Sequence, residues 1–141
     1  MSDIWLSQTV SSSFLEAFRR CDPANEKNET KHFMAFPAVV CAAFSAEIGL
    51  KTILKRQGIN ATGHDLYKLF KKLSPEQQYQ IFEETKMEMK EFVSHLAHSR
   101  LAFVKWRYIH EEIGESFINL NFIGVFAQAI ETISTAANKT A

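Results

Sequence analysis

The densest group of chemically useful side chains in this sequence lies between residues 106 and 111. Arg107 supplies a guanidinium that can hold a phosphate through two hydrogen bonds, and His110 supplies an imidazole that can move a proton near neutral pH. Trp106 and Tyr108 supply rings that can stack on a nucleobase, and Glu111 adds a carboxylate. This combination predicts a site that acts on the phosphate groups of RNA or of a nucleotide.

A second interpretation of this segment is structural: its rings anchor a connector, and Arg107 pairs with Glu47 or Glu111. Glu47 lies four residues before Lys51 in the most apolar stretch of the chain, which is the favourable order for an ion pair on a helix. This pair is either a modest structural link or a means of orienting a site residue, and both interpretations stay open.

A glycine-bounded turn, Gly58 to Gly63, brings His64 to the start of a short predicted helix. Amide groups at the start of a helix favour anions, so one prediction is a phosphate bound beside His64. The other is that Asp65 caps the helix while His64 only packs beside it.

Charge is unevenly distributed along the chain. Sixteen Lys and Arg balance sixteen Asp and Glu, which argues against a protein built mainly to coat nucleic acid. The middle of the chain nevertheless has six basic residues against a single Asp65, namely Lys51, Lys55, Arg56, Lys68, Lys71 and Lys72. Such a run is either a solvated face or a source of phosphate contacts near His64.

Metal and cofactor chemistry is not predicted. His95 and His98 have the spacing of two metal ligands, but no Cys or second His pair completes a tetrahedral set. Cys21 and Cys41 fit neither a disulfide framework nor a metal knuckle, which favours reduced thiols and a cytoplasmic protein. The chain starts without the pattern of a signal peptide, and polar residues interrupt its longest apolar run, so we expect neither secretion nor a membrane span.

The elements that must position these residues are all predicted to be helices. Twelve Phe against three Pro and five Gly indicate long uninterrupted elements, and the apolar residues recur with helical periodicity. The length of 141 residues fits a single domain over residues 1–141. We therefore predict a compact all-α bundle of about five or six helices.

The expected helix boundaries follow from capping and breaking residues. Asp22-Pro23 should end the first helix, Phe36-Pro37 should open a central one, and Ser74-Pro75 should start a long amphipathic one. The rhythm weakens after Arg100, where no single conformation is expected. The expected helices cover residues from about 4 to 22, 36 to 58, 66 to 73, 75 to 96 and 117 to 137.

Three ordered pieces of the sequence resemble a HEPN-domain protein. They are Phe44 with Ala46-Glu47-Ile48 and Leu50-Lys51, then Gly63-His64-Asp65-Leu66 with Leu69-Phe70, then Phe103 with Trp106-Arg107-Tyr108. The match spans roughly Pro37 to Glu112. It implies a compact, commonly dimeric helical bundle of the kind found in bacterial toxin–antitoxin and phage-defence systems and in RNA-processing proteins.

The resemblance also implies a chemistry, because many HEPN domains are metal-independent endoribonucleases. In these, an Arg and a His separated by four to six residues act on the phosphate and on the ribose 2′-hydroxyl. Here Arg107 and His110 are the catalytic candidates, although only two residues separate them; on a helix they would share a face. The supporting or phosphate-binding candidates are Glu47, Lys51, His64, Asp65, Trp106, Tyr108 and Glu111.

Two functions are consistent with these observations. The first is an RNA-directed protein of a bacterial defence or toxin–antitoxin system that acts as a metal-independent endoribonuclease. The second is a non-catalytic HEPN-like module that binds RNA, a nucleotide or a protein within a defence or regulatory assembly. The expected partners are RNA or a nucleotide, a second copy of the chain, and an antitoxin or defence-system protein, with no cofactor and no membrane.

Overall fold

The computed structural model of the protein describes residues 2–22, 31–107 and 119–140. These residues form seven helices and no strand, so the predicted all-α fold is confirmed. In chain order the helices are α1 (Ser2–Cys21), α2 (Lys31–Arg56), α3 (Leu66–Lys71), α4 (Pro75–Thr85), α5 (Met89–Ser99), α6 (Ala102–Arg107) and α7 (Leu120–Thr140).

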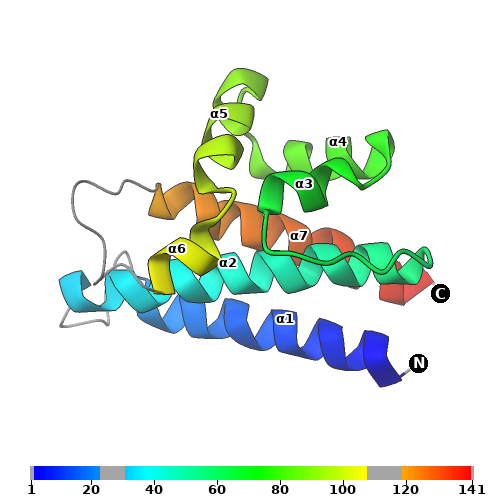
Figure 1. Ribbon diagram of the computed structural model, residues 1–141, viewed down its shortest axis with the longest axis horizontal. Helices are drawn as coiled ribbons and strands as arrows, with labels where there is room; N and C mark the ends of the chain where they lie inside the picture. Colours follow the sequence, from blue (N-terminus) through cyan, green and yellow to red (C-terminus); the bar gives the residue numbers. More distant parts are fainter. Residues whose placement is uncertain (1, 23–30, 108–118, 141) are drawn as a thin grey trace.

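Three long helices, α1, α2 and α7, form the body of the molecule. They run along its longest axis, and α2 packs against both of the others (Figure 1). The shorter helices α3, α4 and α5 lie on the side of α2 that faces away from α1, and α6 lies against α2. The first and last helices bring the two ends of the chain to the same end of the bundle.

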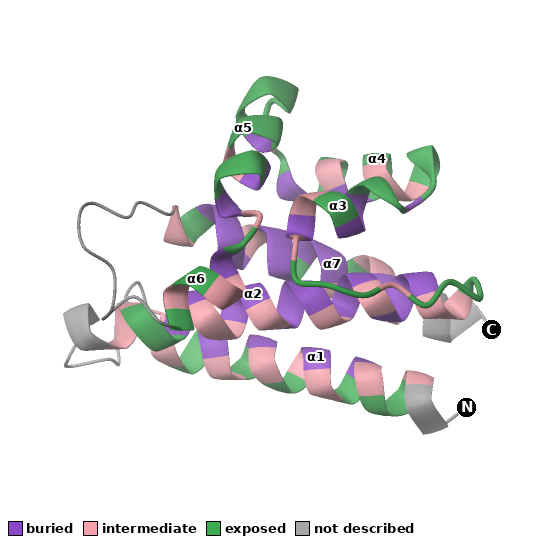
Figure 2. Cartoon of the chain, in the orientation of Figure 1, coloured by how far each residue is buried: buried purple, intermediate pink, exposed green. Residues whose placement is uncertain are grey.

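Helix α2 is the centre of the hydrophobic core. Small side chains such as Ala42, Ala43 and Ala46 are completely buried and allow neighbouring helices to approach closely. Figure 2 shows that buried residues concentrate on α2 and α7, whereas α4 and α5 present exposed residues outward. The predicted central helix is therefore confirmed, and its buried position explains its apolar composition.

Part of α2 also has the length and apolar character of a membrane span. This segment is Met34–Arg56, and 67% of its most apolar window is buried inside the protein. Central helices of bundles have the same composition, so this single segment is weak evidence for a membrane.

The long amphipathic helix predicted after Ser74 is wrong, because the structure has two helices there. Its predicted start is confirmed: Ser74 Oγ accepts a hydrogen bond from the Gln77 backbone N–H, and the Gln77 side chain accepts one from the Ser74 N–H. Lys86 then adopts a left-handed conformation, with φ 57° and ψ 29°, and ends α4. The apolar pattern does not reveal this break, because Phe82 of α4 and Phe92 of α5 still meet edge to face.

Other boundaries also differ from expectation. α2 begins at Lys31, so Pro37 lies inside the helix and not in its first turn. A helix, α6, occupies the stretch where the rhythm weakens. α7 starts at Leu120, where the Asn119 side chain accepts a hydrogen bond from the Phe122 N–H at 3.0 Å.

Candidate functional site

Glu47 is the buried acidic residue at the centre of the candidate site. It lies in the second half of α2 and is only 1% exposed, and a carboxylate in that position is costly unless it is paired. Lys51 Nζ donates a hydrogen bond to Glu47 Oε2 at 3.1 Å, so the predicted ion pair is present. His64 Nδ1 lies 3.0 Å from Oε1 and 3.1 Å from Oε2 of the same carboxylate. The structure therefore brings together Glu47, Lys51 and His64.

The loop before α3 carries His64 back to Glu47. α2 ends in a Schellman motif, in which the Gly58 and Ile59 N–H groups donate to the carbonyls of Lys55 and Leu54, both at 3.0 Å. Gly58 has a φ of 78°, the left-handed value that this motif needs. The chain then runs back along α2, as Figure 1 shows. This reversal places a residue from the end of the loop beside one near the middle of the helix.

The two nitrogens of the His64 ring have different surroundings: Nδ1 contacts the Glu47 carboxylate, and Nε2 does not. An ionised carboxylate can only accept hydrogen bonds, so the proton on the ring that faces Glu47 is on Nδ1. When the ring is neutral, Nε2 carries the lone pair, and it makes no hydrogen bond with the residues that the structure describes. The His64 side chain is 49% exposed, so the ring is open to a ligand or to water. The arrangement suits transfer of a proton.

Asp65, the next residue, has a structural role. Its Oδ1 accepts hydrogen bonds from the N–H groups of Tyr67 and Lys68, which makes it the cap of α3, as one of the two interpretations predicts. Its Oδ2 accepts two more from Arg100, from Nε at 2.9 Å and from Nη2 at 2.8 Å. The Asp65 carboxylate therefore already accepts hydrogen bonds from the amide groups that would bind a phosphate in the other interpretation.

The pKa of Asp65 reflects these contacts. Burial acts to raise the pKa, but the hydrogen bonds and charge of Arg100 and the two backbone donors outweigh it, so the pKa is lowered. The Arg100 carbonyl also accepts a hydrogen bond from the Leu66 N–H at 2.7 Å. Arg100 therefore fastens the His64 loop to the segment that leads into α6. Arg100 could not be identified from the sequence as a site residue, because nothing local links it to Asp65.

Phe103 of α6 connects His64 with Arg107. Its ring stacks on Phe44 of α2 with centroids 4.5 Å apart, and the His64 ring lies 5.9 Å from it. The guanidinium carbon of Arg107 lies over the same ring, 4.5 Å from the centroid, in a cation–π contact. Arg107 and His64 therefore both contact one aromatic side chain.

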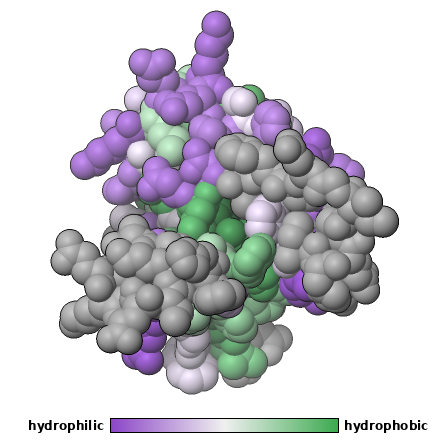
Figure 3. Space-filling model, turned by 90° about the vertical axis from the view of Figure 1, so that its left-hand side faces the viewer, coloured by the Kyte–Doolittle hydropathy of each residue, from purple (hydrophilic) through white to green (hydrophobic). Residues whose placement is uncertain are grey.

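A cavity lies beside Arg107. It has a volume of about 350 Å³ and is lined by Phe36, Pro37, Val40, Trp106 and Arg107. The rings of Phe36 and Trp106 lie 6.2 Å apart and are tilted by 31°. Figure 3 looks onto the end of the molecule where α6 meets the start of α2, and it shows an apolar band on this face.

Arg56, which belongs to the basic run, does not join the site around Glu47. Its guanidinium donates to the Ser134 carbonyl at 2.8 Å and to the Gln8 side chain at 3.2 Å, so it ties α2 to α7 and α1. Burial lowers its pKa. The remaining basic residues of the run on and after α3, Lys68, Lys71 and Lys72, are exposed.

The two spaced histidines of α5 have separate contacts. His95 stacks on Phe122 with centroids 5.4 Å apart, and His98 Nδ1 lies 2.8 Å from the Ser94 carbonyl. Within the described residues, no three His, Cys, Asp or Glu side chains come together in a way that could hold a metal ion.

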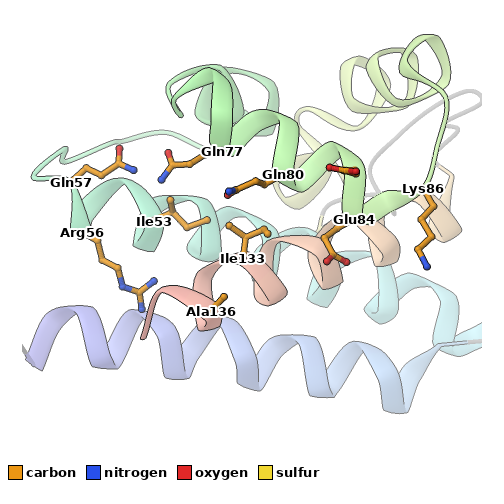
Figure 4. Close-up of a pocket in the computed structure, with 10 residues that line it drawn as sticks. Ile53, Arg56, Gln57, Gln77, Gln80, Glu84, Lys86, Ile133 and Ala136 are labelled. Atoms are coloured by element: carbon orange, nitrogen blue, oxygen red, sulfur yellow. The ribbon is translucent and has the colours of Figure 1, made fainter. Parts of the chain in front are cut away.

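A second cavity was not suggested by the sequence. It is a groove of about 770 Å³ between the end of α2, α4 and α7. Figure 4 shows the amides of Gln57, Gln77 and Gln80 along one side, with Ile53 and Ile133 beside them. None of the predicted site residues that the structure describes lines it. Its walls come from three helices that share no motif, so no sequence signal pointed to it.

Three predicted site residues, Tyr108, His110 and Glu111, lie outside the described residues. The pairing of Arg107 with His110 therefore stays a prediction.

Comparison of the chain with protein-family models, curated proteins and solved structures gave no match.

Proposed function

We propose that this chain is a HEPN-like, RNA-directed protein that cleaves RNA without a metal ion and uses His64 to move the proton. The observation that carries the proposal is the contact between buried Glu47 and half-exposed His64. A carboxylate on Nδ1 fixes the tautomer and orientation of an imidazole and strengthens Nε2 as a base. This gives the described site a proton-transfer group that does not depend on His110.

The proposed reaction is internal attack by a ribose 2′-oxygen on the neighbouring phosphorus. The bond from that oxygen to phosphorus forms while the bond from phosphorus to the 5′ oxygen breaks, which leaves a 2′,3′-cyclic phosphate and a 5′-hydroxyl. His64 Nε2 accepts the 2′-hydroxyl proton, and the imidazolium returns a proton to the leaving oxygen. Arg107 stabilises the negative charge on the phosphate oxygens.

The resemblance to HEPN domains supplies the biological setting of the proposal. In that setting the protein is cytoplasmic, forms a homodimer and belongs to a bacterial toxin–antitoxin or defence system with a partner protein. RNA is its substrate, because only RNA carries the 2′-hydroxyl that the reaction consumes.

One observation favours the second candidate function, a non-catalytic module that binds RNA, a nucleotide or a protein. Lys51 already neutralises Glu47. In the second candidate function, the Lys51–Glu47–His64 link fastens the loop to α2 and has no further role. In that case His64 matters for stability and not for chemistry.

The test is a cleavage assay on single-stranded RNA in the presence of a chelator. We expect the wild-type protein to give products that end in a 2′,3′-cyclic phosphate. His64→Ala should lower the rate by at least about 100-fold, because it removes the proton-transfer group. Glu47→Gln should lower it by about tenfold or more, because it removes the charge that orients and polarises the ring.

His98→Ala is the matched control, because this exposed histidine on α5 lies outside the site and its known contact is with its own helix. It should leave the rate within about twofold of wild type. Cleavage that survives His64→Ala, or that stops when the chelator is added, contradicts the proposal. Salt-sensitive RNA binding with no cleavage identifies the non-catalytic module instead.

A further inference from the structure

We infer that Arg100 is a positioning residue for the proposed proton transfer, and that it acts by holding the segment that directly follows His64. This inference rests on the proposed function, in which His64 moves the proton. Arg100 acts through residues 65–67, because its contacts are with these three residues.

The loop supports His64 weakly from the side that precedes it. Residues 60–63 form no hydrogen bond with any residue that the structure describes, although Ala61 packs against the core. Gly63 has a φ of 91°, and a Cβ at this position would meet nothing within 4 Å. A glycine in open space leaves the backbone free to turn. The position of His64 therefore depends on its contact with Glu47 and on the residues that follow it.

Arg100 contacts each of the next three residues. Its Nε and Nη2 donate to Asp65 Oδ2 at 2.9 Å and 2.8 Å, and its carbonyl accepts a hydrogen bond from the Leu66 N–H at 2.7 Å. Its guanidinium carbon lies 5.2 Å from the centroid of the Tyr67 ring, in a cation–π contact. Two donors on one planar group restrain the orientation of a carboxylate as well as its distance. The segment after His64 is therefore fixed in both respects.

This restraint matters because the His64 ring has a narrow working position. Nδ1 lies 3.0 Å and 3.1 Å from the two oxygens of Glu47, and a hydrogen bond weakens quickly beyond this range. A displacement of about 1 Å can lower the rate of an enzymatic step by about 100-fold. Glu47 determines which ring nitrogen carries the proton, and Arg100 keeps the ring where Glu47 can do so.

The alternative is that Arg100 only adds stability. Its side chain is 40% exposed, so solvent partly screens its pairing with Asp65. In that case Arg100→Ala lowers the stability of the protein but leaves the His64 ring as it is in the folded state. The two roles are separated by a measurement on the ring itself.

The first measurement is NMR of the full-length protein with ¹⁵N-labelled histidine rings. Long-range correlations between ring protons and nitrogens distinguish a neutral ring protonated on Nδ1 from one protonated on Nε2. We expect the Nδ1–H form for His64 in the wild-type protein, and loss of about half or more of it in Arg100→Ala. Arg20→Ala is the matched control, because Arg20 also donates to a carboxylate, that of Glu16, but lies on α1. It should leave the His64 signals unchanged.

The second measurement is the kinetics of RNA cleavage. Arg100→Ala should lower kcat by about 10- to 100-fold and change KM by less than about threefold, because Arg100 is not proposed to contact the substrate. Arg100→Lys should recover part of kcat, since lysine keeps the charge but not the pair of hydrogen bonds. In a protein that already carries His64→Ala, Arg100→Ala should cause no further loss of cleavage, because it acts through His64.

Asp65→Asn tests the same contact if Arg100→Ala does not fold. Asparagine still caps α3 but lacks the charge that Arg100 contacts. It should shift the His64 signals in the same direction as Arg100→Ala, by a smaller amount.

The inference is overturned if Arg100→Ala and Asp65→Asn both keep the Nδ1–H form of His64, or if Arg100→Ala lowers cleavage by the same factor with and without His64. A changed ring with an unchanged kcat also overturns it, because the position of the ring then has no effect on the reaction. Absence of RNA cleavage by the wild-type protein overturns the proposed function instead. The NMR measurement then decides on its own whether Arg100 orients His64.

Discussion

Asp65 illustrates how one side chain can link parts of the chain that are far apart in sequence. It caps α3 through the Tyr67 and Lys68 amides and accepts hydrogen bonds from Arg100, 35 residues later. Its lowered pKa means that the native carboxyl loses its proton more readily than the unfolded one. The contact therefore stabilises the protein fully above the ordinary aspartate pKa of about 3.9, and this stabilisation is lost as pH falls through the lowered native value.

We expect Asp65→Asn to lower the free energy of unfolding at pH 7 by about 0.5–1 kcal/mol. Asparagine is an equally good helix cap, so the change removes mainly the charge that Arg100 contacts, and that guanidinium is partly screened by solvent. Urea unfolding followed by circular dichroism should show a deficit at pH 7 that shrinks below about pH 3.9. Glu16→Gln is the control, because Arg20 and Arg19 also lower the pKa of Glu16, but solvent screens these exposed pairs, so the change should affect stability less than Asp65→Asn does. A deficit of the same size at pH 7 and at pH 3 would contradict the assignment.

The sequence predicts site contacts that are local and misses those that depend on distant segments meeting. Glu47 and Lys51 are one turn apart on a single helix, so their ion pair follows from spacing alone. The contact between Glu47 and His64 depends on a loop that reverses along α2, and the sequence gives only the turn. Arg100 belongs to no motif, and Phe103 enters only as part of the family resemblance. Their contacts with Asp65 and with Phe44 join segments that are far apart in sequence.

At the scale of elements, a helix start with a local sequence signal can be predicted, whereas a helix break without one cannot. The start of α4 can be predicted from Ser74, because the capping box is complete within four residues. The break at Lys86 carries no such signal, since a lysine in the left-handed region is uncommon and the apolar residues on both sides still face the core. Two helices were therefore predicted as one.

This strain leads to a prediction for the α4–α5 junction. Lys86→Gly should raise the free energy of unfolding by up to about 1 kcal/mol, because glycine adopts a positive φ without the penalty of a Cβ. Lys90→Gly is the matched control: Lys90 lies in the first turns of α5, where glycine lowers stability by about 0.5–1 kcal/mol. Thermal unfolding of both variants measures the difference in sign. Destabilisation by Lys86→Gly would show that the lysine side chain matters more than its backbone conformation.

At the scale of the whole molecule, close contacts of α2 hold the three long helices together. Ser11 of α1 and Ser45 of α2 each donate a hydroxyl hydrogen bond to the other's carbonyl, both at 2.8 Å. One turn further along α2, Gly49 faces both Ser11 and Ile130 of α7, and it has no side chain to hold the helices apart. Side chains at these positions set the spacing on which the site depends, because Glu47 lies between them in sequence.

The last prediction concerns that close approach. A Cβ added at Gly49 would lie 2.6 Å from Ile130 Cγ2 and 3.1 Å from Ser11 Oγ, so Gly49→Ala forces α2, α7 or the Ile130 side chain to move. Glycine to alanine inside a helix normally stabilises by about 0.5–1 kcal/mol, but here we expect a loss of about 1–3 kcal/mol from overpacking.

Ile130→Ala, which removes the obstructing methyl group, separates the two effects. Alone it should destabilise by about 2–5 kcal/mol, because Ile130 is completely buried. Combined with Gly49→Ala it should cost less than the sum of the single changes, because the new methyl group occupies space that the isoleucine has left. Chemical denaturation of all four proteins gives this coupling. Additive effects, or a stabilised Gly49→Ala protein, would mean that α2 and α7 have room to separate and that the tight contact at Gly49 does not fix the bundle.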